Sequence, residues 1–167
     1  MLRLCFVCLG NICRSPTAEA VMRQMLQVEE LHAQVQVDSA GTGSWHVGHP
    51  PDARSAQAAL RRGYTLTGHA RQVRVADLHE MDYLLALDRS NLADLRALAV
   101  QSGASPRAEL ALLRDFDPES PTGQDVPDPY YGGAAGFDHV LDVVEAACAG
   151  LLRHLRRELA GHNRLKG

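Results

Sequence analysis

The strongest restriction on the fold comes from the start of the chain, where an apolar strand runs directly into a loop and a helix start. Residues 2–7 have the apolar content of a buried strand. Gly10 and Asn11 then break the pattern with residue types that tolerate unusual backbone angles. Ser15 and Pro16 follow as an expected N-cap and first helical residue. Such a strand–loop–helix unit is typical of α/β proteins with a parallel sheet.

The rest of the chain continues this alternation. Further strands are expected at 35–39, 83–87 and 109–113, and helices at 15–32, 53–62, 76–80, 88–100 and 137–159. Residues 115–136 are rich in Pro, Asp and Gly, which indicates a long loop. The alternation predicts a single α/β/α domain over residues 1–167, with helices on both faces of a parallel sheet. Ligands of such sheets bind at the carboxyl ends of the strands, where residues 8–15 fall.

The charge balance narrows the classes of partner. The chain has 17 basic and 20 acidic residues, which gives a formal net charge of -3. A protein that holds nucleic acid through its surface charge should be basic, so we expect no nucleic-acid partner. A single anion pocket remains compatible with this balance, because net charge does not describe one site.

The cysteines indicate chemistry rather than a disulfide framework. Three of the four, Cys5, Cys8 and Cys13, lie within the first thirteen residues. The opening apolar run is short and contains Arg3, so we expect neither a secretory signal nor a membrane span. In the reduced cytoplasm that this implies, clustered cysteines are more often catalytic or metal-binding than structural. Cys5 and the isolated Cys148 are expected to pack in the core.

The loop from Cys8 to Ser15 has the residues for phosphate chemistry. Backbone N–H groups at the start of a helix, together with the helix dipole, form a cradle for an anion. That positive field favours the thiolate form of Cys8, and the planar guanidinium of Arg14 can hold two phosphate oxygens. The Ser15 hydroxyl can hydrogen-bond the thiolate. These parts predict attack of Cys8 on a bound phosphate, with no metal or other cofactor because the amides and Arg14 stabilise the charge.

Motifs along nearly the whole chain resemble those of the low-molecular-weight protein tyrosine phosphatases. They lie, in the family's order, at residues 7–20, 38–42, 50–52, 69–72, 88–91 and 128–131. The resemblance implies a four-stranded parallel sheet and hydrolysis of phosphotyrosine-containing proteins through a cysteinyl-phosphate. Bacterial members of the family often reverse tyrosine-kinase phosphorylation, which makes a bacterial tyrosine kinase a candidate partner.

The resemblance also assigns a general acid. Phosphate-ester cleavage requires a proton for the leaving oxygen, and a carboxylic acid on the long loop could supply it. The residues alone leave Asp115, Asp117, Asp125 and Asp128 open. Asp128 is the one that matches the acid of the family's Asp-Pro-Tyr motif.

Further site residues follow from the same likeness. Asn11, Ser39 and His69 match residues that brace the loop, with the Asn11 side chain bonded to the other two. Together with Asn11, the phosphate-binding loop comprises Leu9, Gly10, Ile12, Cys13 and Ser15. The residues expected in the pocket walls are Leu9, Ile12, Trp45, Tyr130 and Tyr131. A deep pocket with such walls suits a phosphorylated ring, whereas phosphoserine is too short to reach the floor.

Other functions fit the sequence less well. Protein arginine phosphatases of this fold have Thr where Ile12 stands, so Ile12 favours phosphotyrosine. Related arsenate reductases need a downstream cysteine pair, whereas Cys148 stands alone. A catalytically silent module would not need Cys8, Arg14 and Asp128 together. The loose spacing of His46, His49 and Asp52 does not support a metal site. We also expect a reversible disulfide between Cys8 and Cys13 under oxidants, which would protect Cys8.

Overall fold

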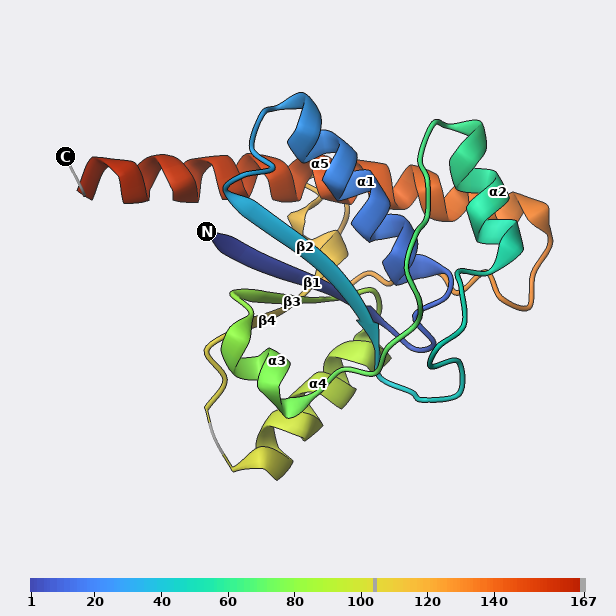
Figure 1. Ribbon diagram of the computed structural model, residues 1–167, viewed down its shortest axis with the longest axis horizontal. Coiled ribbons are helices and arrows are strands. Elements are labelled where there is room, and N and C mark those ends of the chain that lie inside the picture. The colour runs from blue at the N-terminus through green and yellow to red at the C-terminus, as the bar shows by residue number, and fades with distance from the viewer. Residues whose placement is uncertain (104, 166–167) are drawn as a thin grey trace.

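A computed structural model describes residues 1–103 and 105–165 (Figure 1). Within these residues, four strands form one sheet: β1 (Leu2–Cys8), β2 (Val35–Gly41), β3 (Tyr83–Ala86) and β4 (Glu109–Leu112). The strands lie in the order β2-β1-β3-β4, and each neighbouring pair is parallel. The predicted α/β fold with a four-stranded parallel sheet is therefore confirmed.

Helices cover both faces of the sheet (Figure 1). One face is covered by α1 (Arg14–Val28), α2 (Ala53–Arg61) and α5 (Ala134–Leu165), and the other by α3 (Val75–Glu80) and α4 (Arg89–Ser102).

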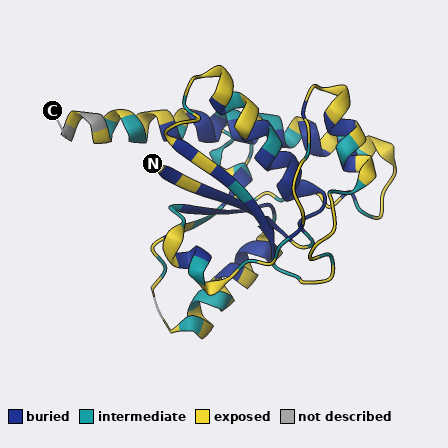
Figure 2. Cartoon of the chain, in the orientation of Figure 1, coloured by how far each residue is buried: buried dark blue, intermediate teal, exposed yellow. Residues whose placement is uncertain are grey.

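Strand β1 serves two separate cores. Leu4 and Phe6 belong to the core beneath α1 and α5, whereas Cys5 and Val7 belong to the core beneath α3 and α4. Successive side chains of a strand point to opposite faces, so a central strand must be apolar at nearly every position. Only Arg3 is exposed within β1, and the strand is otherwise dark blue in Figure 2.

Helix α1 begins and ends differently from the prediction. Its N-cap is Cys13, whose side chain makes no capping hydrogen bond, and Ser15 and Pro16 lie inside the first turn. The predicted capping role of Ser15 is wrong because other side chains engage its hydroxyl. Proline is tolerated there because the first N–H groups of a helix have no helical partner. The helix ends at Val28 rather than near residue 32, since Glu30 adopts a left-handed φ of 56°.

The long segment after β4 contains structure that the sequence pattern did not predict. A 3-10 turn, η1 (Leu113–Phe116), precedes irregular chain, and α5 begins at Ala134, three residues before the expected start. A Cβ atom on Gly150 would lie 1.9 Å from the Phe116 carbonyl oxygen. Glycine at this position thus lets α5 pack directly against η1.

None of the described helices combines the length and the apolar character that crossing a bilayer requires.

Candidate active site

The loop predicted to bind phosphate lies where β1 passes into α1, at the carboxyl ends of the strands. A cavity of about 320 Å³ opens above it. Its lining includes Cys8, Arg14 and Asp128, the three residues predicted to carry out chemistry. The rest of the lining is formed by the loop and the predicted walls, with one addition: Leu9, Gly10, Ile12, Cys13, Trp45, His46, Tyr130 and Tyr131. The structure therefore gathers these residues in one place.

Cys8 lies at the floor of the cavity and is almost completely buried. Its sulfur is 3.0 Å from the Ser15 Oγ and accepts a hydrogen bond of 3.3 Å from the Asn11 backbone N–H. An anionic sulfur can accept both hydrogen bonds. The arrangement thus suits a nucleophile that leaves again as a thiolate.

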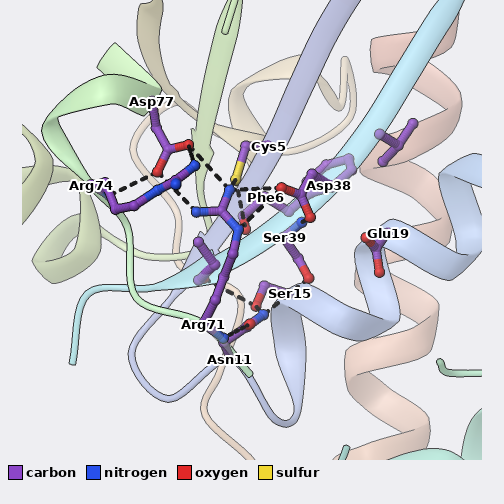
Figure 3. Close-up of polar contacts among 12 residues, drawn as sticks. Cys5, Phe6, Asn11, Ser15, Glu19, Asp38, Ser39, Arg71, Arg74 and Asp77 are labelled. Carbon is purple, nitrogen blue, oxygen red and sulfur yellow. Dashed lines mark hydrogen bonds and ion pairs between the residues drawn. The ribbon is translucent and has the colours of Figure 1, made fainter. Parts of the chain in front are cut away.

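Asn11 holds the loop in shape from behind. Its φ of 57° lies in the left-handed region, where asparagine is among the few tolerated side chains. Its Nδ2 donates to the Ser15 Oγ at 2.8 Å and the Ser39 Oγ at 3.0 Å, and its Oδ1 accepts from the Arg71 N–H at 2.9 Å (Figure 3). One buried amide therefore ties the loop to α1, β2 and the segment after α2.

His69 does not join this network. It is exposed, and among the described residues no hydrogen bond connects it to Asn11. Backbone hydrogen bonds of Gly41 with Arg71 and Val73 instead bring the Arg71 N–H against the Asn11 oxygen. The predicted bond between Asn11 and Ser39 is present, whereas the predicted bond to His69 is replaced by a backbone donor two residues further along.

A charged cluster fixes Arg71, and the sequence pattern did not reveal it. The guanidinium bonds Asp38 at 2.7 Å and the fully buried Asp77 at 2.9 Å (Figure 3). Burial alone would raise the pKa of Asp77, but hydrogen bonds from Arg71 and the Arg74 N–H lower it instead. Burial likewise opposes the charge of Arg71, and the two carboxylates outweigh it and raise the Arg71 pKa. Each of these partners lies far from the loop in sequence.

Arg14 is held at the cavity by groups from two other loops. Its Nη1 donates to the Asp88 carboxylate at 2.6 Å and the Val126 carbonyl at 3.1 Å. Burial opposes its charge, but the neighbouring Cys8, Asp88 and Asp128 outweigh burial and raise the Arg14 pKa. Asp88 lies in the motif at 88–91, but it was not predicted as a site residue, because the motif does not show which distant side chain it meets.

Asp128 is the only one of the four candidate acids that lines the cavity. Its side chain is 41% exposed, and one oxygen lies 3.5 Å from Arg14 Nη2. The other three carboxylates have partners elsewhere: Asp115 accepts from the Gly123 N–H, Asp117 from the Glu119 N–H, and Asp125 from Arg89. The geometry therefore favours the acid that the resemblance selected.

Aromatic side chains form the rim. Trp45 is 71% exposed and lies against Gly43, where a Cβ would be 1.9 Å from its ring. The Tyr130 and Tyr131 rings meet edge to face with centroids 4.9 Å apart. His46, which the sequence does not predict as a site residue, has its ring centroid 6.0 Å from that of Tyr130 and forms part of the wall. Among the described residues, no group of three or more His, Cys, Asp or Glu is arranged to hold a metal ion.

Asp52 and Arg54 connect the phosphate loop to this rim. The Asp52 N–H donates to the Ile12 carbonyl at 2.8 Å, and the Asp52 carboxylate caps α2 and accepts from the Arg54 side chain at 3.0 Å. The Arg54 guanidinium lies 5.4 Å from the Tyr130 ring centroid and 4.8 Å from that of Phe137. This contact places Tyr130 relative to the loop.

Comparison with known proteins agrees with the geometry. The family model for low molecular weight phosphotyrosine protein phosphatase matches residues 3–161. The low molecular weight protein-tyrosine-phosphatase of Streptomyces coelicolor is 46% identical over 95% of this chain and 96% of its own. The crystal structure of a protein tyrosine phosphatase from Entamoeba histolytica gives a TM-score of 0.84 at 38% identity, covering 95% of this chain and 99% of that one. An arginine phosphatase structure from Drosophila gives 0.84 at 33% identity, covering 93% and 98%.

The chain belongs to the low molecular weight phosphotyrosine protein phosphatase family. The predicted family and the predicted enzyme class, a phosphoric monoester hydrolase, are thereby confirmed.

Proposed function

We propose that the protein hydrolyses phosphotyrosine in proteins, with Cys8 as nucleophile, Arg14 as phosphate ligand and Asp128 as general acid and base. The observation that carries this proposal is one cavity with the Cys8 sulfur at its floor and both other side chains in its lining. The loop amides and Arg14 would hold the phosphate oxygens above the sulfur.

The first step forms a cysteinyl-phosphate. The Cys8 sulfur attacks phosphorus as the bond to the tyrosyl oxygen breaks, and Asp128 donates its proton to that oxygen. Arg14 and the loop amides stabilise the charge on the phosphoryl oxygens, so the step needs no metal.

The second step returns the enzyme to its starting state. The Asp128 carboxylate takes a proton from water, and the water oxygen attacks phosphorus while the sulfur–phosphorus bond breaks. The Ser15 Oγ, 3.0 Å from the sulfur, can donate a hydrogen bond to the departing thiolate. Inorganic phosphate is the second product.

The walls support an aryl phosphate as substrate. Ile12, Trp45 and Tyr130 surround the cavity with apolar and aromatic surface, which suits a ring whose phosphate must reach the floor. Phosphoproteins of the bacterial cytoplasm are the proposed substrates, and a bacterial tyrosine kinase is the proposed source of the modification. The similarity to the Drosophila arginine phosphatase makes phosphoarginine the alternative to test.

One panel of substrates tests this function. Peptides with phosphotyrosine, phosphoarginine or phosphoserine, and arsenate reduction, would be assayed side by side at mildly acidic pH. We expect phosphotyrosine turnover that EDTA leaves unchanged and that Cys8→Ser lowers by at least about 10⁴-fold. Turnover by the Cys8→Ser protein close to that of the unchanged protein would refute the mechanism, and a preference for phosphoarginine would refute the substrate.

We also propose that Cys13 protects Cys8 from irreversible oxidation. Burial raises the pKa of Cys13 to about 12 against a hydrogen bond with Ser55, so Cys13 is a thiol at neutral pH. Peroxide would oxidise Cys8 to a sulfenic acid, which condenses with that thiol to a disulfide and water. Thiol should restore activity after peroxide in the unchanged protein and not in Cys13→Ser. Equal recovery in both would remove this role.

A further inference from the structure

A second cleft lies beside the cavity that holds Cys8. It has a volume of about 310 Å³ and separates the segment that follows β2 from helix α4. Leu9 and Trp45 line both spaces and so form a partition between them. In Figure 1 the chain leaves β2 close to α4, at the same end of the sheet as the phosphate loop.

The partition is exposed to solvent. Trp45 is 71% exposed and Leu9 is 41% exposed, and the Trp45 ring is supported from below by Gly43. A polypeptide whose phosphotyrosine side chain enters the first cavity can cross these two side chains. A neighbouring side chain of the same polypeptide would then reach the second cleft.

The residues that line the cleft suit one chemical class of substrate side chain. Among the described residues that line the cleft, Asp94 is the one charged group. It is exposed, and no hydrogen bond or ion pair within that part of the chain engages its carboxylate. Gln72 donates its Nε2 to the Thr42 carbonyl at 3.1 Å, which leaves the amide oxygen as an acceptor. Leu98 and Trp45 add apolar surface to the same lining. A long apolar stem with a cationic end matches this pattern.

We propose that the cleft binds a lysine or arginine of the substrate polypeptide close to the phosphotyrosine, with Asp94 as the residue that determines this preference. The inference rests on the proposed function and specifies its substrate class. The aliphatic stem packs on Leu98 and the Trp45 ring, and the cation meets the Asp94 carboxylate. The indole face adds a favourable interaction with the same charge.

Peptides that differ in one flanking residue test this proposal. Lys, Ala or Glu would be placed singly at each of the three positions on either side of phosphotyrosine in an otherwise neutral peptide. At one or more positions we expect kcat/KM to be about two- to fivefold higher for Lys than for Ala, since an exposed ion pair contributes little. Glu should be the poorest residue there, and added salt should shrink the difference.

Variants of α4 show whether the cleft is responsible. Asp94→Asn should abolish the preference and Asp94→Lys should reverse it. Ala97→Phe should abolish it by filling the cleft with the charge left in place. Glu80→Gln removes an exposed carboxylate that lines neither space, so it should keep the preference and reveals any effect of net charge alone.

Free phosphotyrosine separates this inference from the proposed function. It is too small to span the partition, so all four variants should hydrolyse it at the rate of the unchanged protein. Equal turnover of the Lys, Ala and Glu peptides at every position would overturn the role of the cleft, as would a preference that survives Asp94→Asn. Failure of the unchanged protein to hydrolyse free phosphotyrosine would instead overturn the function itself.

Discussion

The phosphate loop and the loop that carries Asp128 face each other across one cavity, but they are held in different ways. The phosphate loop is fastened from behind by the buried Asn11 amide, whose bonds are all to neutral groups. The loop that carries Asp128, residues 117–133, is largely exposed to solvent. Arginine side chains make several of its contacts. Arg89 and Arg114 hold Asp125, and Arg54 contacts Tyr130.

The difference follows from what each loop must do. Stabilising phosphoryl oxygens requires donors that are already in place and need not reorganise during the reaction. Delivering a proton requires a carboxyl group at an opening through which substrate and water pass. Arg14 joins the two regions, because it contacts both the Val126 carbonyl and Asp128. The predictions below separate the contributions of the two loops, beginning with the largest effect.

Removing the acid from the exposed loop should produce a loss that depends on the leaving group. Asp128→Asn keeps the shape of the side chain but cannot donate the proton. We expect phosphotyrosine turnover to fall by about 10²- to 10³-fold, and that of an activated aryl phosphate with an acidic phenol much less. Steady-state kinetics over phenols of graded acidity would show it. A uniform loss across all of them would argue that Asp128 only positions substrate.

Breaking the charged cluster behind the phosphate loop should act on stability. Asp77→Asn leaves Arg71 with Asp38 as its remaining carboxylate partner, and we expect a loss of about 3 kcal/mol in the free energy of unfolding. Denaturant titration measures it. Asp38→Asn, which removes the more exposed carboxylate, is the matched control and should cost less.

The same pair should make that stability depend on pH. The pKa of Asp77 is lower in the folded protein than in the unfolded chain. Its stabilising contribution is therefore complete above the unfolded value of about 3.9 and is lost as pH falls through the folded value. The stability gap between the unchanged protein and Asp77→Asn should narrow below about pH 4. A constant gap would show that the carboxylate charge does not supply the stability.

Substitutions of Asn11 test whether its side chain or its backbone angle matters more. Asn11→Ala loses both, and we expect a destabilisation of about 2 kcal/mol together with reduced turnover. Asn11→Gly accepts the left-handed φ at no steric cost, so it should recover part of the stability but not the turnover. Equal turnover in Asn11→Gly and the unchanged protein would show that the amide bonds are dispensable for the reaction.

The weakest effect should come from the contact between Arg54 and Tyr130. Arg54→Ala should raise KM about threefold with little change in kcat, because the ring loses the charge that places it. Arg54→Lys should recover part of the loss. Arg61→Ala, in the same helix and paired with Asp138, should leave KM unchanged. A fall in kcat for Arg54→Ala would extend its influence to Asp128.

The sequence predicted the local parts of this molecule well. The alternating buried strands and amphipathic helices appear near their expected positions because their patterns are carried by neighbouring residues. The contacts that shape the site are not local. Asp88 and Arg71 lie in the motifs at 88–91 and 69–72, but no sequence pattern shows that Asp88 meets Arg14 or that the Arg71 N–H meets Asn11. Each contact depends on how distant segments meet. His69 was misjudged for the same reason, because a backbone donor took the bond assigned to its side chain.

The partners of Arg14 also bear on how the protein folds. Asp88, Val126 and Asp128 lie 74, 112 and 114 positions further along the chain. Contacts between such distant positions incur the entropy of closing long loops, so they form after the local helices and slow the overall rate. The anion site is thus completed only when most of the chain has assembled. Regain of turnover during refolding should follow the last kinetic phase, which makes the enzyme's own reaction a reporter of complete folding.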